Sequence, residues 1–332
     1  MSKKKSFLIG LMVCIAGLII GCGTKTTGNL QTDDGKVHVI CTTFPLYDWT
    51  RQIVGENDNV EITYLLENGT DIHSFQPGAK QTADISNCDV LIYVGGASEE
   101  WLDEMAENAM NQDMKVIRLM DVLSENVREE TVVAGMQEHD HKEEGEEEHH
   151  HEGTEYDEHV WLSLRNAKKS CEAIKIALCE KDAENAAMYE ANYTEYVGKL
   201  DALDEKFAEM VNVAKRNTIL VGDRFPFAYL VEDYEINYYA AFPGCSAETE
   251  ASFETVAFLS TKMDEENLPV MLVIENSDKK IAKTILNNTK NPDREILVLN
   301  SLQSVKKADM EAGVSYLSIM EANYEVLEKA LN

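Results

Sequence analysis

Short β-rich apolar runs alternate with helical stretches in both outer thirds of this chain. A compact apolar run such as DVLIYV at residues 89–94, stopped at once by two glycines, is typical of a buried parallel strand. Strands are predicted at residues 37–41, 60–66, 89–94, 116–119, 218–221, 237–241, 270–274 and 296–299. Intervening helices are expected, among others, at residues 252–263, 279–289 and 310–331. The pattern predicts an α/β fold with two lobes, each a mostly parallel sheet flanked by helices.

The middle third is helical and separates the two alternating thirds. Apolar residues spaced three and four apart run from 164 to 178 and resume after Asp182. Asp182 suits the N-cap of a second helix at 183–215, which would be about 48 Å long at roughly 1.5 Å per residue. Such a helix is long enough to join two lobes; the alternative is a two-helix hairpin packed on one core. We expect lobes at 36–162 and 216–332, joined by helices at 163–215, with a ligand crevice between strand ends.

The first residues have the layout of a secretory signal, because three lysines precede an uncharged apolar run at 7–20 that is too short to span a bilayer comfortably. The run ends Ile-Ile-Gly-Cys, which resembles the bacterial lipobox. Residues 1–21 are then the signal peptide, Cys22 is the lipidated first residue, and 22–35 is a flexible tether. This predicts a protein anchored by lipid on the extracytoplasmic face of the cell membrane. The alternatives are an ordinary signal peptide with an incidental cysteine, or an uncleaved anchor.

Charge and cysteine usage narrow the functional class. The formal net charge of −30 argues against nucleic-acid binding and favours cations. Beyond Cys22 the chain has an odd number of cysteines and no C-x-x-C pair. Cys171 and Cys179 lie about 12 Å apart on one predicted helix, whereas a disulfide requires Cα atoms within about 7 Å. We therefore expect no disulfide framework, despite export.

A polar tract at 138–159 holds six of the eight histidines and eleven acidic side chains. With almost no apolar residue it has nothing to bury, so residues 138–158 are predicted to form a solvated loop. Neutral imidazoles are good ligands for zinc, and a high local concentration of them suits a weak metal-collecting site. The alternative is a disordered insertion of no consequence. The auxiliary ligands of the loop would be His139, His141, His149, His150 and His151.

Two D-x-H elements stand next to predicted sheet edges. His73 follows a strand and has Asp71 two residues earlier; His159 ends the acidic tract and has Asp157 two residues earlier. A carboxylate in this position can orient the imidazole ring from outside the ligand shell. One loop histidine is usually a surface residue, but two in the same context indicate a shared metal site.

The chain resembles the solute-binding lipoproteins that deliver zinc or manganese to ABC importers. The resemblance covers most of the mature chain: GTDIHSFQP at 69–77, the acidic histidine loop, DEHVWL at 157–162, and the long helix that follows. It implies that His73 and His159 are metal ligands, and the histidine-rich loop is typical of the zinc-specific members. It also implies delivery of Zn²⁺ to a membrane permease with a cytoplasmic ATPase. We expect a monomer that is not an enzyme.

The second lobe departs from the family pattern. Family members place a histidine, or a glutamate in manganese binders, in a run that here reads GDRFPFAYL at 222–230, where Arg224 takes the ligand position. Arginine is permanently protonated and does not ligate. The family's fourth ligand is an aspartate after the last strand, and Asn300 stands there. An amide oxygen is a poor zinc ligand beside carboxylate or imidazole.

Three residues are candidates to complete the site. Asp223, one position from Arg224, is the expected third ligand. Cys245 follows a strand and turn, and its thiolate would suit zinc strongly and manganese hardly at all; the alternative is a small buried cysteine. Glu275, at the end of VMLVI, either supports the site from outside the ligand shell or pairs with Arg224. Water or Cys245 is the candidate for the fourth coordination position of the metal.

Three other functions remain possible. A receptor for Mn²⁺ or Fe²⁺ would use hard oxygen ligands on the second lobe. A secreted zinc hydrolase would need an open coordination position beside a general base, and we find no H-E-x-x-H or G-x-S-x-G motif. A surface adhesin would use metal only to stabilise its fold. Because an imidazole must be neutral to bind a metal, histidine ligation predicts that affinity falls below about pH 6.5.

Overall fold

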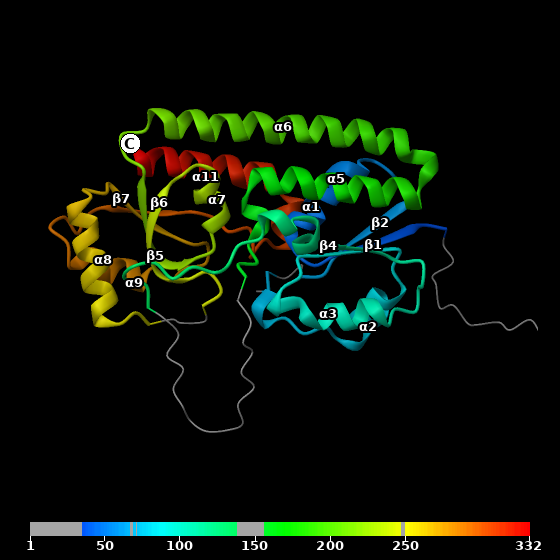
Figure 1. The fold of residues 1–332 in the computed structure, drawn as a ribbon, viewed down its shortest axis with the longest axis horizontal. Helices are drawn as coiled ribbons and strands as arrows, with labels where there is room; N and C mark the ends of the chain where they lie inside the picture. Colours follow the sequence, from blue (N-terminus) through cyan, green and yellow to red (C-terminus); the bar gives the residue numbers. More distant parts are fainter. Residues whose placement is uncertain (1–34, 67–68, 71, 138–155, 247–249) are drawn as a thin grey trace, which may run out of the picture. The chain divides into compact units, whose positions relative to one another are not determined.

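The computed structural model describes residues 35–66, 69–70, 72–137, 156–246 and 250–332. Two four-stranded sheets, each with parallel pairing throughout, form its two lobes. Helices lie on both faces of each sheet (Figure 1). The predicted α/β class with two parallel-sheet lobes is confirmed.

The N-terminal sheet has the order β2-β1-β3-β4, with bounds β1 Val37–Cys41, β2 Val60–Tyr64, β3 Val90–Tyr93 and β4 Lys115–Arg118. Its helices are α1 Phe44–Val54, α2 Ala79–Asn87, α3 Glu100–Glu107 and the single turn α4 Leu119–Val122. All four residues of β3 are buried, as a continuous apolar run between two helical layers requires. Val39 packs into the large core under α1, whereas Ile40 and Leu91 face α2 and α3.

The C-terminal sheet repeats this arrangement with the order β6-β5-β7-β8 and bounds β5 Thr218–Phe225, β6 Asn237–Pro243, β7 Val270–Val273 and β8 Glu295–Val298. Its helices are α7 Ala228–Asp233, α8 Phe253–Glu265, α9 Lys280–Asn287, α10 Lys307–Glu311 and α11 Tyr316–Leu331. Strand β5 is longer than predicted and shifts register against β6 between Val221 and Arg224. Gly222 lies in this irregular part, where a Cβ would approach the Ala282 backbone to 2.9 Å.

Two helices connect the lobes. Helix α5 (Leu164–Lys181) is followed by a short 3-10 turn (Ala183–Asn185) and by α6 (Ala186–Val213), which is about 42 Å long at roughly 1.5 Å per residue. Helix α6 packs against α1 of the first lobe and α11 of the second (Figure 1). One apolar cluster includes residues of both sheets and of α5, α6 and α11. The chain therefore combines both expected arrangements: a helix that spans two lobes, and a helix pair packed on a shared core.

One local prediction is wrong. The helix expected at 310–331 is divided into α10 and α11, because Gly313 between them adopts φ +93° and Ser315 caps α11 by accepting a hydrogen bond from Ser318 N. As predicted, a helix begins directly after Asp182, but it starts as the 3-10 turn Ala183–Asn185, and the Asp182 carboxylate accepts hydrogen bonds from the Tyr189 hydroxyl and the Asn185 side-chain amide.

Within the described ranges, none of the helices has the length and apolar character that a membrane crossing needs. Cys41, Cys88, Cys171, Cys179 and Cys245 are free thiols. Cys22 and the five histidines from His139 to His151 lie outside the described residues.

Candidate metal centre

Three side chains from distant parts of the sequence converge where the two lobes meet. His73 lies in the 3-10 turn Ile72–Ser74 after β2, His159 immediately precedes the 3-10 turn Val160–Leu162, and Cys245 follows β6. Their ligand atoms all lie within 4.8 Å of one another, and the two imidazole centroids are 5.8 Å apart. Two nitrogens and one sulfur at this spacing form a set of donors suited to zinc.

His159 is completely buried and rigidly held. Its Nδ1 lies 2.9 Å from Asp157 Oδ1, which also accepts a hydrogen bond from His159 N at 2.8 Å. Asp157 is itself fixed, because its carbonyl accepts from the Tyr229 hydroxyl at 2.8 Å. The other ring nitrogen, Nε2, is buried and has no hydrogen-bond partner among the described residues. Donation from Nδ1 to a carboxylate leaves the Nε2 lone pair for a cation, as expected for Asp157 acting from outside the ligand shell.

His73 is oriented by residues that the sequence did not indicate. Its Nδ1 lies 2.6 Å from Ser98 Oγ and 3.8 Å from Glu158 Oε2. Ser98 N in turn donates to Glu158 Oε1 at 2.8 Å, so Ser98 and Glu158 form one polar group behind the ring. Because Nδ1 faces this group, Nε2 is the nitrogen that would coordinate a cation. Asp71, which was expected to orient this ring, lies outside the described residues.

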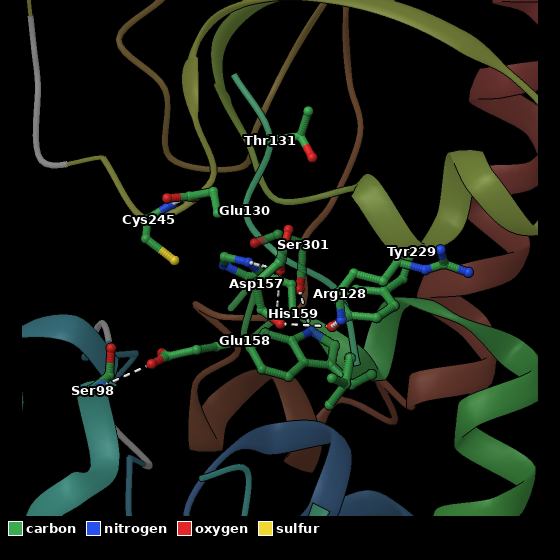
Figure 2. Close-up of polar contacts among 12 residues, drawn as sticks. Ser98, Arg128, Glu130, Thr131, Asp157, Glu158, His159, Tyr229, Cys245 and Ser301 are labelled. Carbon is green, nitrogen blue, oxygen red and sulfur yellow. Dashed lines mark hydrogen bonds and ion pairs between the residues drawn. The ribbon is translucent and has the colours of Figure 1, made fainter. Parts of the chain in front are cut away.

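Cys245 belongs to the second lobe. Its backbone N donates a hydrogen bond to Glu130 Oε1 at 2.9 Å. Burial raises the pKa of the Cys245 thiol well above its usual value, and the charges of Glu130, Asp157 and Glu158 raise it further. The thiol is therefore protonated at neutral pH until a cation displaces the proton, since a coordinating thiol is deprotonated. Figure 2 shows Cys245 and Glu130 on one side of the site and Ser98 on the other, with Glu158 and His159 between them.

The close packing of the site depends on glycine beside it. A Cβ on Gly244 would lie 3.2 Å from His159 Cε1 and 2.9 Å from the Phe225 carbonyl oxygen. The edge of the Trp161 ring system also faces His159, with ring centroids 5.3 Å apart. The indole Nε1 of Trp161 donates to the Ser301 carbonyl at 2.9 Å, which joins the His159 segment to the second lobe.

The structure does not bring the other second-lobe candidates into the cluster. Asp223, expected as the third ligand, accepts a hydrogen bond from Arg224 N at 3.0 Å, and burial raises the pKa of its carboxyl group. Asp223 occupies the irregular part of β5 and is not one of the three converging side chains; among the second-lobe candidates, the structure places Cys245 with the two histidines. Asn300 accepts from Leu302 N and stabilises a turn.

Glu275 contacts the loop at Ser301, which in turn contacts the His159 segment. Its carboxylate accepts from Ser301 N at 2.8 Å and from Ser301 Oγ at 2.7 Å. Because the Ser301 carbonyl accepts from Trp161, Glu275 stabilises the loop against which the His159 segment packs. Glu275 thus contacts the His159 segment only indirectly, through Ser301 and Trp161, and its supporting role stays a prediction.

Comparisons with known proteins identify the family. Residues 39–330 match the sequence profile of ZnuA, zinc-uptake complex component A, periplasmic. The zinc-binding lipoprotein AdcA of Streptococcus pneumoniae serotype 4 is 31% identical over 330 residues, which are 98% of this chain and 61% of that protein. The high-affinity zinc uptake system protein ZnuA of Bacillus subtilis is 29% identical over 332 residues, 100% of this chain and 99% of that protein.

Solved structures show the same fold. The Zn(II)-bound ZnuA-like domain of Streptococcus pneumoniae AdcA is similar with a TM-score of 0.69 and 26% identity, over 90% of this chain and 99% of that one. The metal-dependent lipoprotein YcdH of Bacillus subtilis is similar with a TM-score of 0.71 and 25% identity, over 90% of this chain and 100% of that one. This chain spans about 61% of the length of the pneumococcal AdcA protein.

Proposed function

The chain belongs to the family of zinc-uptake complex component A, and we propose that this member is an extracytoplasmic receptor for Zn²⁺. The receptor binds the ion between its two lobes and passes it to the membrane permease of an ABC importer driven by a cytoplasmic ATPase. The lobes correspond to residues 36–162 and 216–332, with the linking helices between them.

The observation that carries this proposal is the convergence of His73, His159 and Cys245. Two neutral imidazoles and a thiolate suit zinc, whereas manganese and iron(II) prefer more oxygen ligands. The thiol therefore argues against the alternative of a manganese receptor. Receptors for zinc uptake are not enzymes, and we propose no catalytic role for the site.

The histidine-rich tract is proposed to collect metal for this site. The residues that flank the tract are anchored close to the ligands: Gln137 N donates to the carbonyl of Ala241 in β6, and Asp157 N donates to the Arg128 carbonyl. We propose that the tract between these two points, residues 138–155, which lie outside the described residues, raises the local metal concentration through its imidazoles. Deletion of residues 138–152 should remove weak sites and leave the tight site intact.

The membrane anchor remains a proposal from the sequence. Lipidation of Cys22 would keep the receptor at the outer side of the cell membrane, next to the permease. Metabolic labelling with a radiolabelled fatty acid tests it: the wild-type protein should incorporate label and the Cys22→Ala variant should not. Equal labelling of the two proteins would contradict lipidation at Cys22.

The proposed zinc site is tested with a double variant. We expect His73→Ala, His159→Ala to abolish tight zinc binding in a titration by calorimetry, because it removes two of the three converging ligands. His38→Ala, in β1 and outside the cluster, is the matched control and should bind like the wild type. Tight zinc binding by the double variant would refute the site and, with it, the proposed mode of zinc capture.

A further inference from the structure

The segment that carries His159 is attached to the second lobe. Four side-chain hydrogen bonds join residues 157–163 to this lobe, and their partners there are Tyr229, Asp233, Ser301 and Tyr316. The Trp161 indole, which donates to the Ser301 carbonyl at 2.9 Å, also faces the His159 ring with centroids 5.3 Å apart. His159 is therefore held by groups of the second lobe, although it precedes the linking helices in the chain.

Cys245 is attached to the same lobe. It follows β6, and its backbone N donates to Glu130 Oε1 at 2.9 Å. The segment around Glu130 is itself bound to the second lobe, since Arg128 N donates to the Tyr229 hydroxyl at 3.1 Å and the Arg128 guanidinium forms an ion pair with Glu232. Two of the three converging ligands are thus fixed to the second lobe.

His73 is the ligand that the first lobe holds. Its Nδ1 lies 2.6 Å from the hydroxyl of Ser98, which belongs to the 3-10 turn Ala97–Glu99 after β3. For Nε2 of this ring to bind a cation, Nδ1 must carry the proton and donate a hydrogen bond to Ser98 Oγ. The Glu158 carboxylate favours this tautomer, because its Oε2 lies 3.8 Å from the same nitrogen.

Ser98 also contacts the segment that carries His159. Its backbone N donates to Glu158 Oε1 at 2.8 Å, and Figure 2 shows the Glu158 side chain extending from the His159 segment to Ser98. Glu158 is only 3% exposed, and a hydrogen bond to a charged group shielded from water is stronger than one between neutral groups. Gly96 leaves room for this contact, since a Cβ there would lie 2.6 Å from Glu158 Oε1. Ser98 therefore meets both segments, through its hydroxyl and through its backbone.

We propose that Ser98 is a positioning residue for zinc capture; the proposal rests on the zinc-receptor function above. The Ser98 hydroxyl orients the His73 ring, and its backbone N–H holds Glu158. Ser98 thus joins the ligand of the first lobe to the segment that carries His159. It fixes the tautomer of one ring and stabilises the separation of the two rings, whose centroids are 5.8 Å apart. Ligands that are already in place lose less conformational entropy when the ion binds, so this arrangement raises affinity without a contact between Ser98 and the metal.

The two rings are oriented by different groups, which makes the proposal selective. Asp157 Oδ1 lies 2.9 Å from His159 Nδ1, so the His159 tautomer depends on a carboxylate of its own segment. For His73 the corresponding contact is a hydroxyl, that of Ser98. Loss of this hydroxyl should therefore change the state of His73 and leave that of His159 as it is.

The first test is Ser98→Ala, which removes the hydroxyl and keeps the backbone N–H. We expect zinc affinity in a chelator-competition titration to fall by about ten- to a hundredfold, the range for loss of a group that orients a ligand. The loss should appear as faster zinc dissociation in stopped-flow measurements. Ser98→Thr keeps a hydroxyl and should bind within about threefold of the wild type, a difference worth under roughly 0.7 kcal/mol. Wild-type affinity and dissociation rate in Ser98→Ala would overturn the proposal.

A second measurement needs no metal. Nitrogen-15 NMR of the imidazole rings, with the His73 signal assigned from its absence in His73→Ala, reports which ring nitrogen carries the proton. We expect the Nδ1–H tautomer for His73 in the wild type and a larger share of the Nε2–H tautomer in Ser98→Ala, with the His159 signal unchanged. The same His73 tautomer in both proteins would overturn the orienting role.

The contact with Glu158 is tested by a double-mutant cycle. Glu158→Ala removes the acceptor of Ser98 N, so in this background the serine is no longer held and loss of its hydroxyl should cost less zinc affinity. The double variant should therefore lose less affinity than the product of the two single losses. Losses that multiply would show that Ser98 and Glu158 act separately and would overturn the proposed connection between the two segments.

Ser86→Ala is the matched control, because Ser86 is another half-buried serine of the first lobe, whose hydroxyl accepts from Met110 N at 2.9 Å away from the site. It should change zinc affinity by less than about threefold. Thermal unfolding without metal should give the same stability for Ser98→Ala and Ser86→Ala, so that a loss of affinity in Ser98→Ala is not a loss of folding. Failure of these tests would leave the zinc function standing, because that function depends on the double histidine variant.

Discussion

The ionisation of Glu99 makes a quantitative prediction about stability. The side chain is 2% exposed and accepts one hydrogen bond from Gly95 N at 2.8 Å. Burial raises the pKa of Glu99 from 4.5 to about 7; the nearby Thr42 side chain and the hydrogen bond from Gly95 N oppose the shift, and the charge of Glu158 adds to it. The unfolded chain thus loses this proton near pH 4.5, whereas the folded protein keeps it up to about pH 7.

Whether stability rises or falls with pH depends on which state, folded or unfolded, binds the proton. Between pH 4.5 and 7 the folded protein holds more protons than the unfolded chain, so stability falls as pH rises through this window and levels off above it. At roughly 1.36 kcal/mol per pKa unit, the shift corresponds to a loss of about 3 kcal/mol. Glu99→Gln does not ionise and escapes this loss. Relative to the wild type, the variant should therefore gain about 3 kcal/mol between pH 4.5 and pH 8.

The assay is urea unfolding of both proteins at pH 4.5, 6, 7 and 8 in the presence of EDTA, with the difference in unfolding free energy plotted against pH. Other titrating groups contribute equally to the two proteins and cancel in this difference. Glu100→Gln, at the exposed neighbouring position, should give a flat difference. A Glu99→Gln difference that varies by less than about 1 kcal/mol, well below the predicted value, or that runs in the opposite direction, would refute the assignment of a buried, protonated carboxyl.

Four further substitutions test other parts of the structure. Cys245→Ser should lower zinc affinity by at least about tenfold and flatten the rise of affinity with pH. The reason is that binding no longer displaces a proton from a thiol whose pKa is raised by burial. Calorimetry in two buffers measures the affinity and the number of protons released. Gly96→Ala should destabilise the protein by about 1–3 kcal/mol, and it should weaken zinc binding because the added Cβ would meet the Glu158 carboxylate. Gly313 has open space around it, so Gly313→Ala should show the cost of backbone strain alone. Tyr316→Phe removes a buried hydroxyl hydrogen bond of 2.8 Å and should cost about 1 kcal/mol in urea unfolding, with zinc affinity unchanged. Equal effects of the two glycine variants, or a tyrosine variant that loses zinc, would contradict these assignments.

The sheets were predictable because they depend on local sequence. Strands β1 and β3 are short apolar runs buried on both faces, and the residues chosen from the sequence agree with the structure to within one position. The split between α10 and α11 was missed, although Gly313 and Ser315 are local signals, because the apolar spacing on either side favours one continuous helix.

The site was only partly predictable. The D-x-H pattern next to a predicted sheet edge indicates His73 and His159. Cys245 is a candidate because a thiolate is a strong ligand for zinc. The sequence favours Asp223 over Cys245, because Asp223 stands next to the family's ligand position; the irregularity of β5 at Asp223 is visible only in the structure.

The supporting residues depend on contacts between distant segments. Ser98 meets Glu158 across 60 positions, and Glu130 meets Cys245 across 115. No local pattern in one sequence reports such contacts. Glu158 is adjacent to His159 in the chain, but its burial and its contact with Ser98 are visible only in the structure.

The central claim is that His73 and His159 hold one zinc ion together with Cys245. Crystals of the zinc-loaded protein, measured on both sides of the zinc absorption edge, test it most directly. We predict a single strong anomalous peak within about 2.3 Å of the Cys245 sulfur and about 2.1 Å of one nitrogen of each ring. A peak elsewhere in the ordered protein, or none near both rings, would contradict the account.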